Sequence, residues 1–145
     1  MAGFALDHSE GQHVAFVRAE MWIKASRETT DGAFSLVEAV DPMETPRHLH
    51  EREDEAFYIL GGEHEFECGG ETFRLSPGGY IFLPRGVPHA HRRLGDPSVS
   101  RMLIMVSPPG FEEFFVDLSE ARDSGRPLDE AFYGELAAKY GLQWV

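Results

Sequence analysis

Short alternations of apolar and polar residues run through most of the chain, and turn residues close each of them. Because they recur between Val14 and Val106 without helical segments, they predict an antiparallel sandwich or barrel rather than βαβ units. The predicted strands are residues 14–25, taken as two strands broken near residue 20, and residues 34–40, 56–60, 64–68, 71–75, 80–84, 89–93 and 100–107. Gly61-Gly62 and Gly69-Gly70 separate such runs, and tight hairpins are expected at both places because glycine tolerates positive φ.

The hydrophobic period changes from strand-like to helical after Ser107, where Pro108-Pro109-Gly110 interrupts the last strand. One helix is expected after Gly110, and a second is expected to begin near Pro127 and to end before Gly141. The polar stretch 119–126 is expected to connect them. The two apolar stripes are formed by Phe111, Phe114, Phe115 and Leu118, and by Leu128, Phe132, Leu136 and Tyr140. Both stripes predict helices that cover the barrel without a role in its chemistry.

Length and charge limit the expected number of domains and the expected binding partners. A chain of 145 residues with 42% hydrophobic residues is expected to form one domain, with a barrel over about 14–107 and a helical extension over about 110–141. The formal net charge of −12 repels phosphate backbones and anionic lipids, so neither nucleic acid nor a membrane is an expected partner. Residues 1–10 lack the basic start and apolar centre of a secretory signal, and a cytoplasmic location is therefore expected.

The run Pro-Arg-His-Leu-His at residues 46–50 carries the most informative chemistry. In extended chain, residues two apart point to the same side, so His48 and His50 are expected to converge. Glu55 begins the next apolar run, and a turn rich in proline and glycine delivers His89 to a later strand. An isolated His-x-His pair is weak evidence, because such pairs also occur on exposed strands. Together the four side chains predict a site for one divalent metal ion.

The expected donor set is limited to nitrogen and oxygen, because the single cysteine, Cys68, offers no thiolate cluster. Three imidazoles and one carboxylate leave one or two positions open for water or substrate on a metal with five or six ligands. Zinc, nickel, cobalt, manganese and iron are all compatible with this set.

These residues resemble the two sequence motifs of the cupin family. His-x-His followed by Glu and Gly is matched by His48, His50, Glu55 and Gly62, and Gly-x5-Pro-x-Gly-x2-His is matched by Gly78, Pro84, Gly86 and His89. The chain departs from the family pattern at Pro42, where glycine is expected, and at Arg93, where asparagine is common. Neither position is a metal ligand in the family.

The resemblance covers about residues 34–106 and implies an all-β fold, the double-stranded β-helix or jelly-roll barrel, followed here by two short C-terminal helices. It also implies that a metal ion is bound inside one mouth of the barrel. The segment 107–115 is similar to the segment after the barrel in small quercetinase-like cupins of bacteria.

The positions of the other histidines and of several apolar residues suggest roles for them. His91, two residues after His89, is expected to be a neighbour that supports the ligands, an acid/base group or a fifth ligand, unless it is simply a polar residue at the barrel mouth. His64, His8 and His13 are expected to be solvated. Six residues are candidates for an apolar substrate pocket: Met43, Tyr58, Phe66, Met102, Ile104 and Phe111.

Three functions are hypotheses at this point, two of them for an enzyme that acts on an aromatic, hydroxylated small molecule. The leading one is a quercetinase-like dioxygenase in which Glu55 accepts the proton of a substrate hydroxyl. The second is a polyketide cyclase in which the metal polarises a carbonyl while Glu55 or His91 removes an α-proton before aldol closure. The third is a non-catalytic, ligand-binding cupin.

A two-fold homodimer is also expected, because strands 14–25 are long enough to lie across a second subunit. The rival expectation is that the two C-terminal helices cover the exposed sheet surfaces within one chain.

Overall fold

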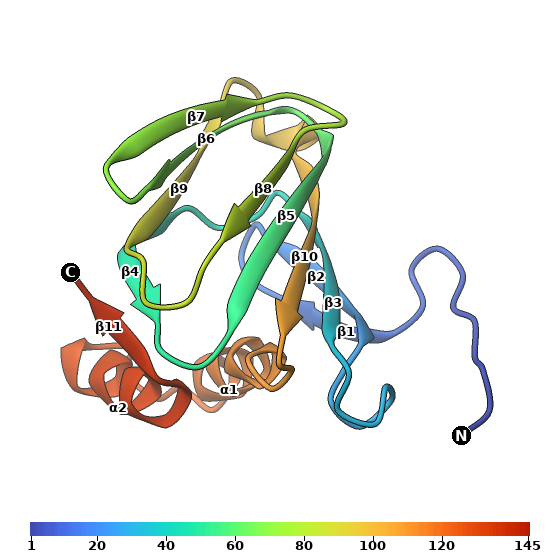
Figure 1. Cartoon of the computed structure of the whole chain (residues 1–145). Coiled ribbons are helices and arrows are strands. Elements are labelled where there is room, and N and C mark those ends of the chain that lie inside the picture. Colours follow the sequence, from blue (N-terminus) through green and yellow to red (C-terminus); the bar gives the residue numbers. More distant parts are fainter.

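Two antiparallel β-sheets face each other in the computed structural model, which describes all residues from Met1 to Val145 (Figure 1). The first sheet consists, in spatial order, of β1 (Gln12–Ala15), β2 (Glu20–Ala25), β3 (Ser35–Val40), β10 (Arg101–Ser107), β5 (Asp54–Gly61) and β8 (Tyr80–Leu83). The second consists of β11 (Leu142–Trp144), β4 (Thr45–His50), β9 (His89–Leu94), β6 (Glu63–Cys68) and β7 (Glu71–Leu75). The expected all-β barrel with two C-terminal helices is confirmed.

Alternation along the strands separates the core from the outer surface. On β5, Phe57 and Ile59 are buried between the sheets while Tyr58 and Leu60 face solvent. This is the period of two that a pleated strand imposes on its side chains. The same strand also delivers Glu55 to the interior, so the apolar pattern itself aims a carboxylate inward.

The two glycine pairs have different roles, and one of the two expected hairpins is wrong. Gly69-Gly70 forms a two-residue turn between the paired strands β6 and β7, with φ of 60° and 86°. Gly61-Gly62 instead carries the chain from β5 in one sheet to β6 in the other. A Cβ atom at Gly61 would lie 2.3 Å from the carbonyl oxygen of Val99, at the end of the short 3-10 helix η1 (Pro97–Val99), so only glycine fits this crossing.

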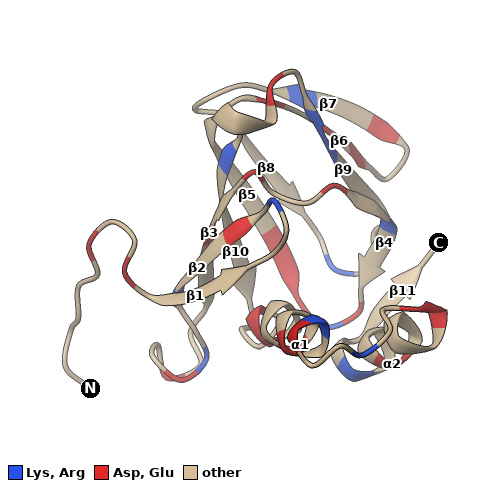
Figure 2. Ribbon diagram, turned by 180° about the vertical axis from the view of Figure 1, so that it is seen from behind, with Lys and Arg blue, Asp and Glu red and all other residues tan.

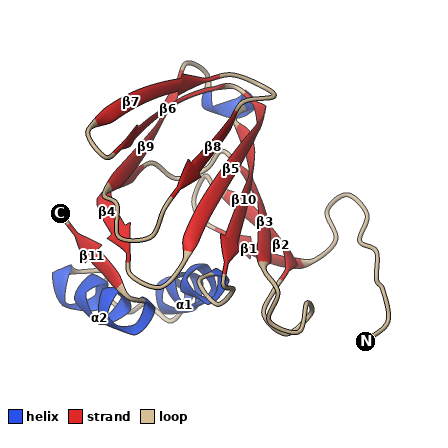
Figure 3. Cartoon of the chain, in the orientation of Figure 1, coloured by secondary structure: helices blue, strands red, loops and turns tan.

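Helices α1 (Glu112–Asp123) and α2 (Glu130–Tyr140) lie at one end of the sheets (Figure 3). Two boundaries differ from the predicted ones. Helix α1 continues into the polar stretch that was expected to be a connection. Helix α2 begins three residues after Pro127, because the side chain of Asp129 accepts a hydrogen bond from the backbone N–H of Phe132 and so forms the N-cap. Leu128 therefore precedes the helix.

The chain ends in a strand that the hydrophobic pattern did not predict, since three residues are too few to show a period. Gly141 ends α2 in the left-handed conformation, and β11 follows at once. In its pairing with β4, Leu142 lies opposite His50 and Trp144 opposite His48. The C-terminal strand therefore pairs with β4, the strand that carries His48 and His50.

At the N-terminus, β1 and β2 form a hairpin, and β2 pairs with β3 of the same chain. Residues before β1 extend away from the sheets (Figure 1). The homodimer stays a prediction, which light scattering can test against the chain mass of 16.3 kDa.

Acidic residues are spread over sheets, helices and loops rather than gathered on one face (Figure 2). Neither helix has the length and apolar character needed to cross a membrane.

Candidate metal centre

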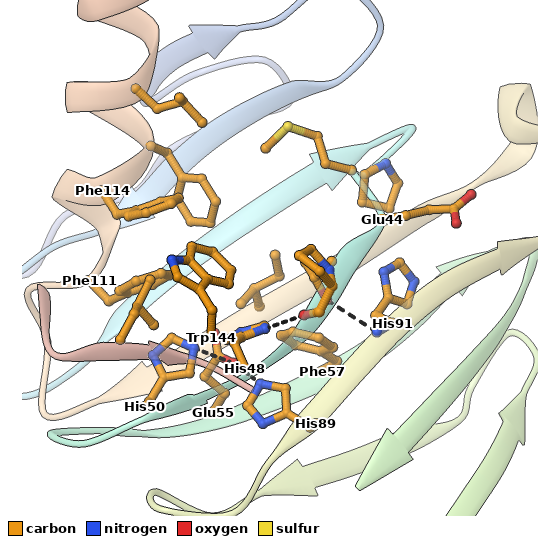
Figure 4. Close-up of a pocket in the computed structure, with 18 of the residues that line it drawn as sticks. Glu44, His48, His50, Glu55, Phe57, His89, His91, Phe111, Phe114 and Trp144 are labelled. Atoms are coloured by element: carbon orange, nitrogen blue, oxygen red, sulfur yellow. Dashed lines mark hydrogen bonds and ion pairs between the residues drawn. The ribbon is translucent and has the colours of Figure 1, made fainter. Parts of the chain in front are cut away.

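Four buried side chains from three strands converge between the two sheets (Figure 4). His48 and His50 come from β4, Glu55 from the start of β5 and His89 from the start of β9. One donor atom of each lies within 4.8 Å of a donor atom of every other. The structure therefore brings together the four residues predicted as metal ligands.

Strand register explains how residues far apart in sequence meet. β4 and β9 are antiparallel neighbours in which His48 lies directly opposite His89. The backbone N–H of Gly86 donates to the carbonyl oxygen of His50 at 2.7 Å, which ties the turn before β9 to the end of β4. Gly86 has a φ of 76°, a conformation that favours glycine, so the second motif needs glycine at this point.

Hydrogen bonds at Nδ1 orient the imidazoles. Nδ1 of His48 donates to the carbonyl oxygen of Pro46 at 2.7 Å, and Nδ1 of His89 donates to that of Val87 at 3.2 Å. Each ring thereby turns Nε2 toward the centre, the arrangement common in histidines that bind metals. His50 is held in the same way by a carboxylate, since its Nδ1 lies 2.5 Å from Oε1 of Glu53.

Glu53 contacts the candidate centre, although the sequence analysis did not single it out. Its side chain is buried although it lies in a loop of charged residues. The signal available in the sequence was its position three residues after a ligand histidine. Glu51 and Arg52 share that loop and Asp54 begins β5, and only the fold shows which of these charged side chains turns inward.

The arrangement fits a divalent cation, as one orphaned atom shows. Nε2 of His50 is 3.1 Å from Oε2 of Glu55, but it is buried and forms no aligned hydrogen bond. A buried polar atom without a partner costs free energy, and a cation shared by the imidazole and the carboxylate would satisfy both. Three nitrogens and one carboxylate oxygen form a donor set that zinc and other first-row metals accept.

The charges of the metal-free centre are coupled. Burial acts to lower the pKa of His50, but the carboxylates of Glu55 and Glu53 outweigh it and raise that pKa to about 9. Burial acts to raise the pKa of Glu55, and the neighbouring His50 and His89 hold it far below its usual value. Burial is the main cause that lowers the pKa of His48 to about 4. Metal binding must therefore release a proton from His50.

The ligands lie in the wall of a cavity of about 500 Å³. Met43, Met102, Ile104 and Phe111, four of the six residues predicted for a substrate pocket, line it. The other two lie elsewhere. Tyr58 is 44% exposed because it follows Phe57 on β5 and so faces outward. Phe66 is fully buried in the core, where its ring centroid is 4.9 Å from that of His91.

The C-terminal segment contributes much of this cavity, which corrects the expectation that the helices only cover the barrel. Five aromatic lining residues were not predicted there: Phe57, Phe114, Phe115, Tyr133 and Trp144. All but the first belong to α1, α2 or β11. The sequence analysis missed them because helical periodicity predicts that a side chain is buried, but it does not show whether that side chain packs in the core or lines a cavity.

His91 lines the same cavity but is not part of the four-ligand cluster. Its Nε2 lies 2.9 Å from Nδ1 of His64, whose Nε2 donates to the carbonyl oxygen of Gly61 at 3.0 Å. Burial, reinforced by His64, lowers the pKa of His91 to about 4. His91 is therefore neutral at pH 7, and its Nε2–H donates to Nδ1 of His64.

His64 itself was expected to be solvated, and that expectation is wrong. Its side chain is fully buried because the alternation on β6 turns it inward together with Phe66. His8 and His13 are exposed, as expected.

Sequence comparison finds related proteins. The chain is 25% identical to an uncharacterized protein of Streptomyces coelicolor over 75% of this chain and 98% of that protein. A shorter match, 42% identical over 59 residues, relates 40% of the chain to 29% of the dimethylsulfoniopropionate lyase DddQ of Ruegeria pomeroyi.

Solved structures share the fold. KdgF from a Halomonas species superposes with a TM-score of 0.64 at 23% identity, over 78% of this chain and 99% of that one. The polyketide cyclase RemF from Streptomyces resistomycificus superposes with a TM-score of 0.59 at 24% identity, over 72% of this chain and 79% of that one. The family model for the cupin domain matches residues 36–106, a range that includes all four ligands. With the two-sheet fold and the buried cluster in place, this region of the chain is a cupin domain.

Proposed function

We propose that this protein is a metal-dependent enzyme that removes a proton from a flat, apolar small molecule that carries an oxygen donor. The observation that carries the proposal is the position of Glu55, which lies in the wall of an apolar cavity beside three buried imidazoles. A divalent ion held by His48, His50, Glu55 and His89 would act as a Lewis acid on the substrate oxygen.

Glu55 is the proton acceptor in this proposal. Its Oε2 faces His50 and His89, each 3.1 Å away, while its Oε1 forms no hydrogen bond within the chain. The neighbouring histidines hold the pKa of Glu55 far below its usual value, so the carboxylate is ionised at neutral pH but is a weak base. Proton transfer to it therefore requires that the substrate be acidified by a metal ion held at the centre. His91 is less suited to this role because it lies outside the four-residue cluster and its ring is hydrogen-bonded to His64.

The cavity supports an aromatic substrate. Its volume of about 500 Å³ falls within the range of small-molecule sites, and twelve of its 22 lining residues are hydrophobic. Such walls exclude water and thereby strengthen the electrostatic interactions made at the ligands. Four further polar residues also line the cavity, namely Glu44, Thr45, His91 and Glu130, but a metal ion at the centre would be the strongest partner for a substrate oxygen.

A non-oxidative reaction of the cyclase type is our preferred assignment. Removal of an α-proton by Glu55, followed by attack of the resulting carbanion on a second carbonyl, would close a ring by aldol chemistry. The names of two similar proteins, a lyase and a polyketide cyclase, support this choice, since neither denotes an oxygenase.

Dioxygenation of a flavonol is the second candidate. It is favoured by the segment Ser107-Pro108-Pro109-Gly110-Phe111, which is similar to that of quercetinase-like cupins. In that reaction Glu55 would accept the proton of the substrate hydroxyl.

Metal analysis followed by two assays tests the proposal. Protein purified without tag or chelator is analysed for bound metal and then incubated in deuterated water with benzoylacetone, an aromatic 1,3-diketone with an acidic α-proton. Exchange at the α-carbon above the rate with metal-free protein supports proton removal. Oxygen uptake with quercetin in an oxygen electrode would instead support dioxygenation, and the absence of both reactions would favour a ligand-binding protein.

The variant Glu55→Gln separates the roles of ligand and base. Glutamine keeps an oxygen donor and the side-chain shape but cannot accept a proton at neutral pH. We expect it to retain part of the metal and to lose exchange by about 100-fold or more, in line with the usual contribution of a general base. Tyr58→Phe, on the outer face of the same strand, is the matched control and should leave exchange unchanged.

A further inference from the structure

Part of the cavity wall is formed by β11, which lies outside the region that matches the cupin domain. Trp144 lines the cavity and is 42% exposed, whereas Phe111 and Phe114 line it and are buried. Trp144 therefore forms part of the rim, where a bound molecule would meet it at the boundary with solvent.

The register of β11 determines where this tryptophan lies. Trp144 is directly opposite His48 on the neighbouring strand, and residues directly opposite in an antiparallel pair project from the same face of the sheet. The ring centroids of Trp144 and His48 are 5.7 Å apart at an angle of 56° (Figure 4). The indole is thus placed beside a metal ligand by the strand that pairs with the ligand's own strand.

The terminal strand is held at several points although it ends the chain. The carbonyl oxygen of Gly141 accepts from the backbone N–H of Glu51 at 2.8 Å, and the backbone N–H of Val145 donates to the carbonyl oxygen of Arg47 at 3.1 Å. The side chain of Gln143 is hydrogen-bonded to that of Glu51. These contacts lie on both sides of Trp144, so its backbone is fixed relative to the centre.

A second aromatic surface stands over another ligand. Phe111 packs its ring against His50 with centroids 4.5 Å apart at 80°, and it stacks on Phe114 with centroids 4.9 Å apart at 16°. Both phenylalanines line the cavity. The centre is therefore flanked by rings that belong to the C-terminal segment, while the cupin domain supplies the ligands.

From this arrangement we propose that Trp144 is a specificity-determining residue that stacks on a planar ring of the substrate, while the substrate's oxygen donor faces the metal centre. The inference rests on the proposed function and deepens it by assigning the ring-binding surface to β11. The substrate class is then a fused or extended aromatic molecule with an oxygen donor at one end. An aliphatic molecule with the same donor would gain less from the indole, because it has no ring to stack.

A series of hydroxamates tests this inference without knowledge of the natural substrate, since the group binds divalent metals and its substituent can be varied. Acetohydroxamate, benzohydroxamate and 2-naphthohydroxamate are titrated into the zinc-loaded full chain by calorimetry. We expect affinity to rise with ring size in the wild type. In Trp144→Ala, the affinity for acetohydroxamate should stay within about threefold, while the preference for the naphthyl compound should fall about tenfold. Trp144→Phe should restore part of that preference.

Trp22→Phe is the control, because this tryptophan lies on β2, stacks on His13 and does not line the cavity. It should leave every dissociation constant unchanged. An unaltered ring preference in Trp144→Ala would overturn the inference and leave the metal centre standing. Loss of zinc from Trp144→Ala would also overturn it, since the indole would then serve to hold His48. Failure of the wild type to take up zinc would overturn the proposed metal site itself, and failure of acetohydroxamate to bind the zinc-loaded wild type would overturn the proposed function, because the centre would then have no position open to a substrate oxygen.

Discussion

The chain contains two His-x-His pairs on neighbouring strands, and they differ in how many of their histidines belong to the ligand cluster. His48 and His50 on β4 both belong to the ligand cluster, whereas on β9 only His89 does and His91 does not. All four side chains are buried. Identical spacing and similar burial therefore do not give identical chemistry.

Register and buried partners account for the difference. Residues two apart on a strand share a face but are separated by roughly 6.6 Å along it, so sharing a face is not the same as meeting at a point. His89 lies opposite His48, while His91 lies opposite Thr45 and finds a partner in His64 instead. His50 is turned to the centre by Glu53. The lesson is that spacing assigns a side chain to a face, and the neighbouring strand decides whether it becomes a ligand.

The largest effect expected from this comparison is on metal content. His50→Ala and His89→Ala should each lose the bound metal while the barrel stays folded, because its core is apolar and does not include the centre. His91→Ala should keep one metal ion per chain. Elemental analysis beside a thermal melt measures both properties. Full occupancy in either of the first two variants, or loss of metal in the third, would contradict the assignment.

The next effect concerns the carboxylate that orients His50. Glu53→Gln should weaken metal binding by about 10-fold to 100-fold, since the partner of a ligand imidazole tunes its orientation and basicity. Competition with a chelator gives the affinity. Glu51→Gln makes the same change of charge at an exposed position of the same loop and should have little effect. Equal affinities for the two variants would argue against a supporting role for Glu53.

A smaller effect is expected from the pair of buried histidines outside the centre. Burial lowers the pKa of His91 to about 4, whereas the unfolded chain has the ordinary value of 6.5. The unfolded state therefore binds more protons as the pH falls below 6.5, and the folded state loses stability until the pH reaches about 4. Between pH 7 and pH 5, the free energy of unfolding is expected to fall by about 2 kcal/mol because of His91.

Urea unfolding of the metal-free protein at the two pH values measures this loss. Because other groups also titrate, the informative quantity is the difference between wild type and His91→Phe. The loss of stability between pH 7 and pH 5 should be smaller in the variant by about the amount given above. Equal losses would show that His91 is not held neutral by the fold.

The smallest expected effect is at the residue opposite His91. The hydroxyl of Thr45 accepts a hydrogen bond from the backbone N–H of His91 at 3.1 Å. Thr45→Val keeps the shape and removes only this bond, so the free energy of unfolding should fall by about 1 kcal/mol with unchanged metal content. A loss of metal comparable to that of His89→Ala would mean that the two halves of β9 are not independent.

The sequence by itself determined the parts of this protein that depend on local spacing. Alternation over residues 56–60 predicted the strand β5, and the two motifs predicted His48, His50, Glu55 and His89 as one cluster. Glycine and proline indicated where strands end. These features are readable because the period of a strand and the limits on φ act over only a few residues.

Only the tertiary structure decided which neighbours those residues meet. It placed His64 against His91, turned Glu53 inward, made Gly61-Gly62 a crossing between sheets rather than a hairpin, and set Trp144 opposite His48. Each outcome depends on the pairing and packing of segments distant in the sequence. Local pattern carries no information on such pairing, because the same alternation permits more than one partner strand and more than one register.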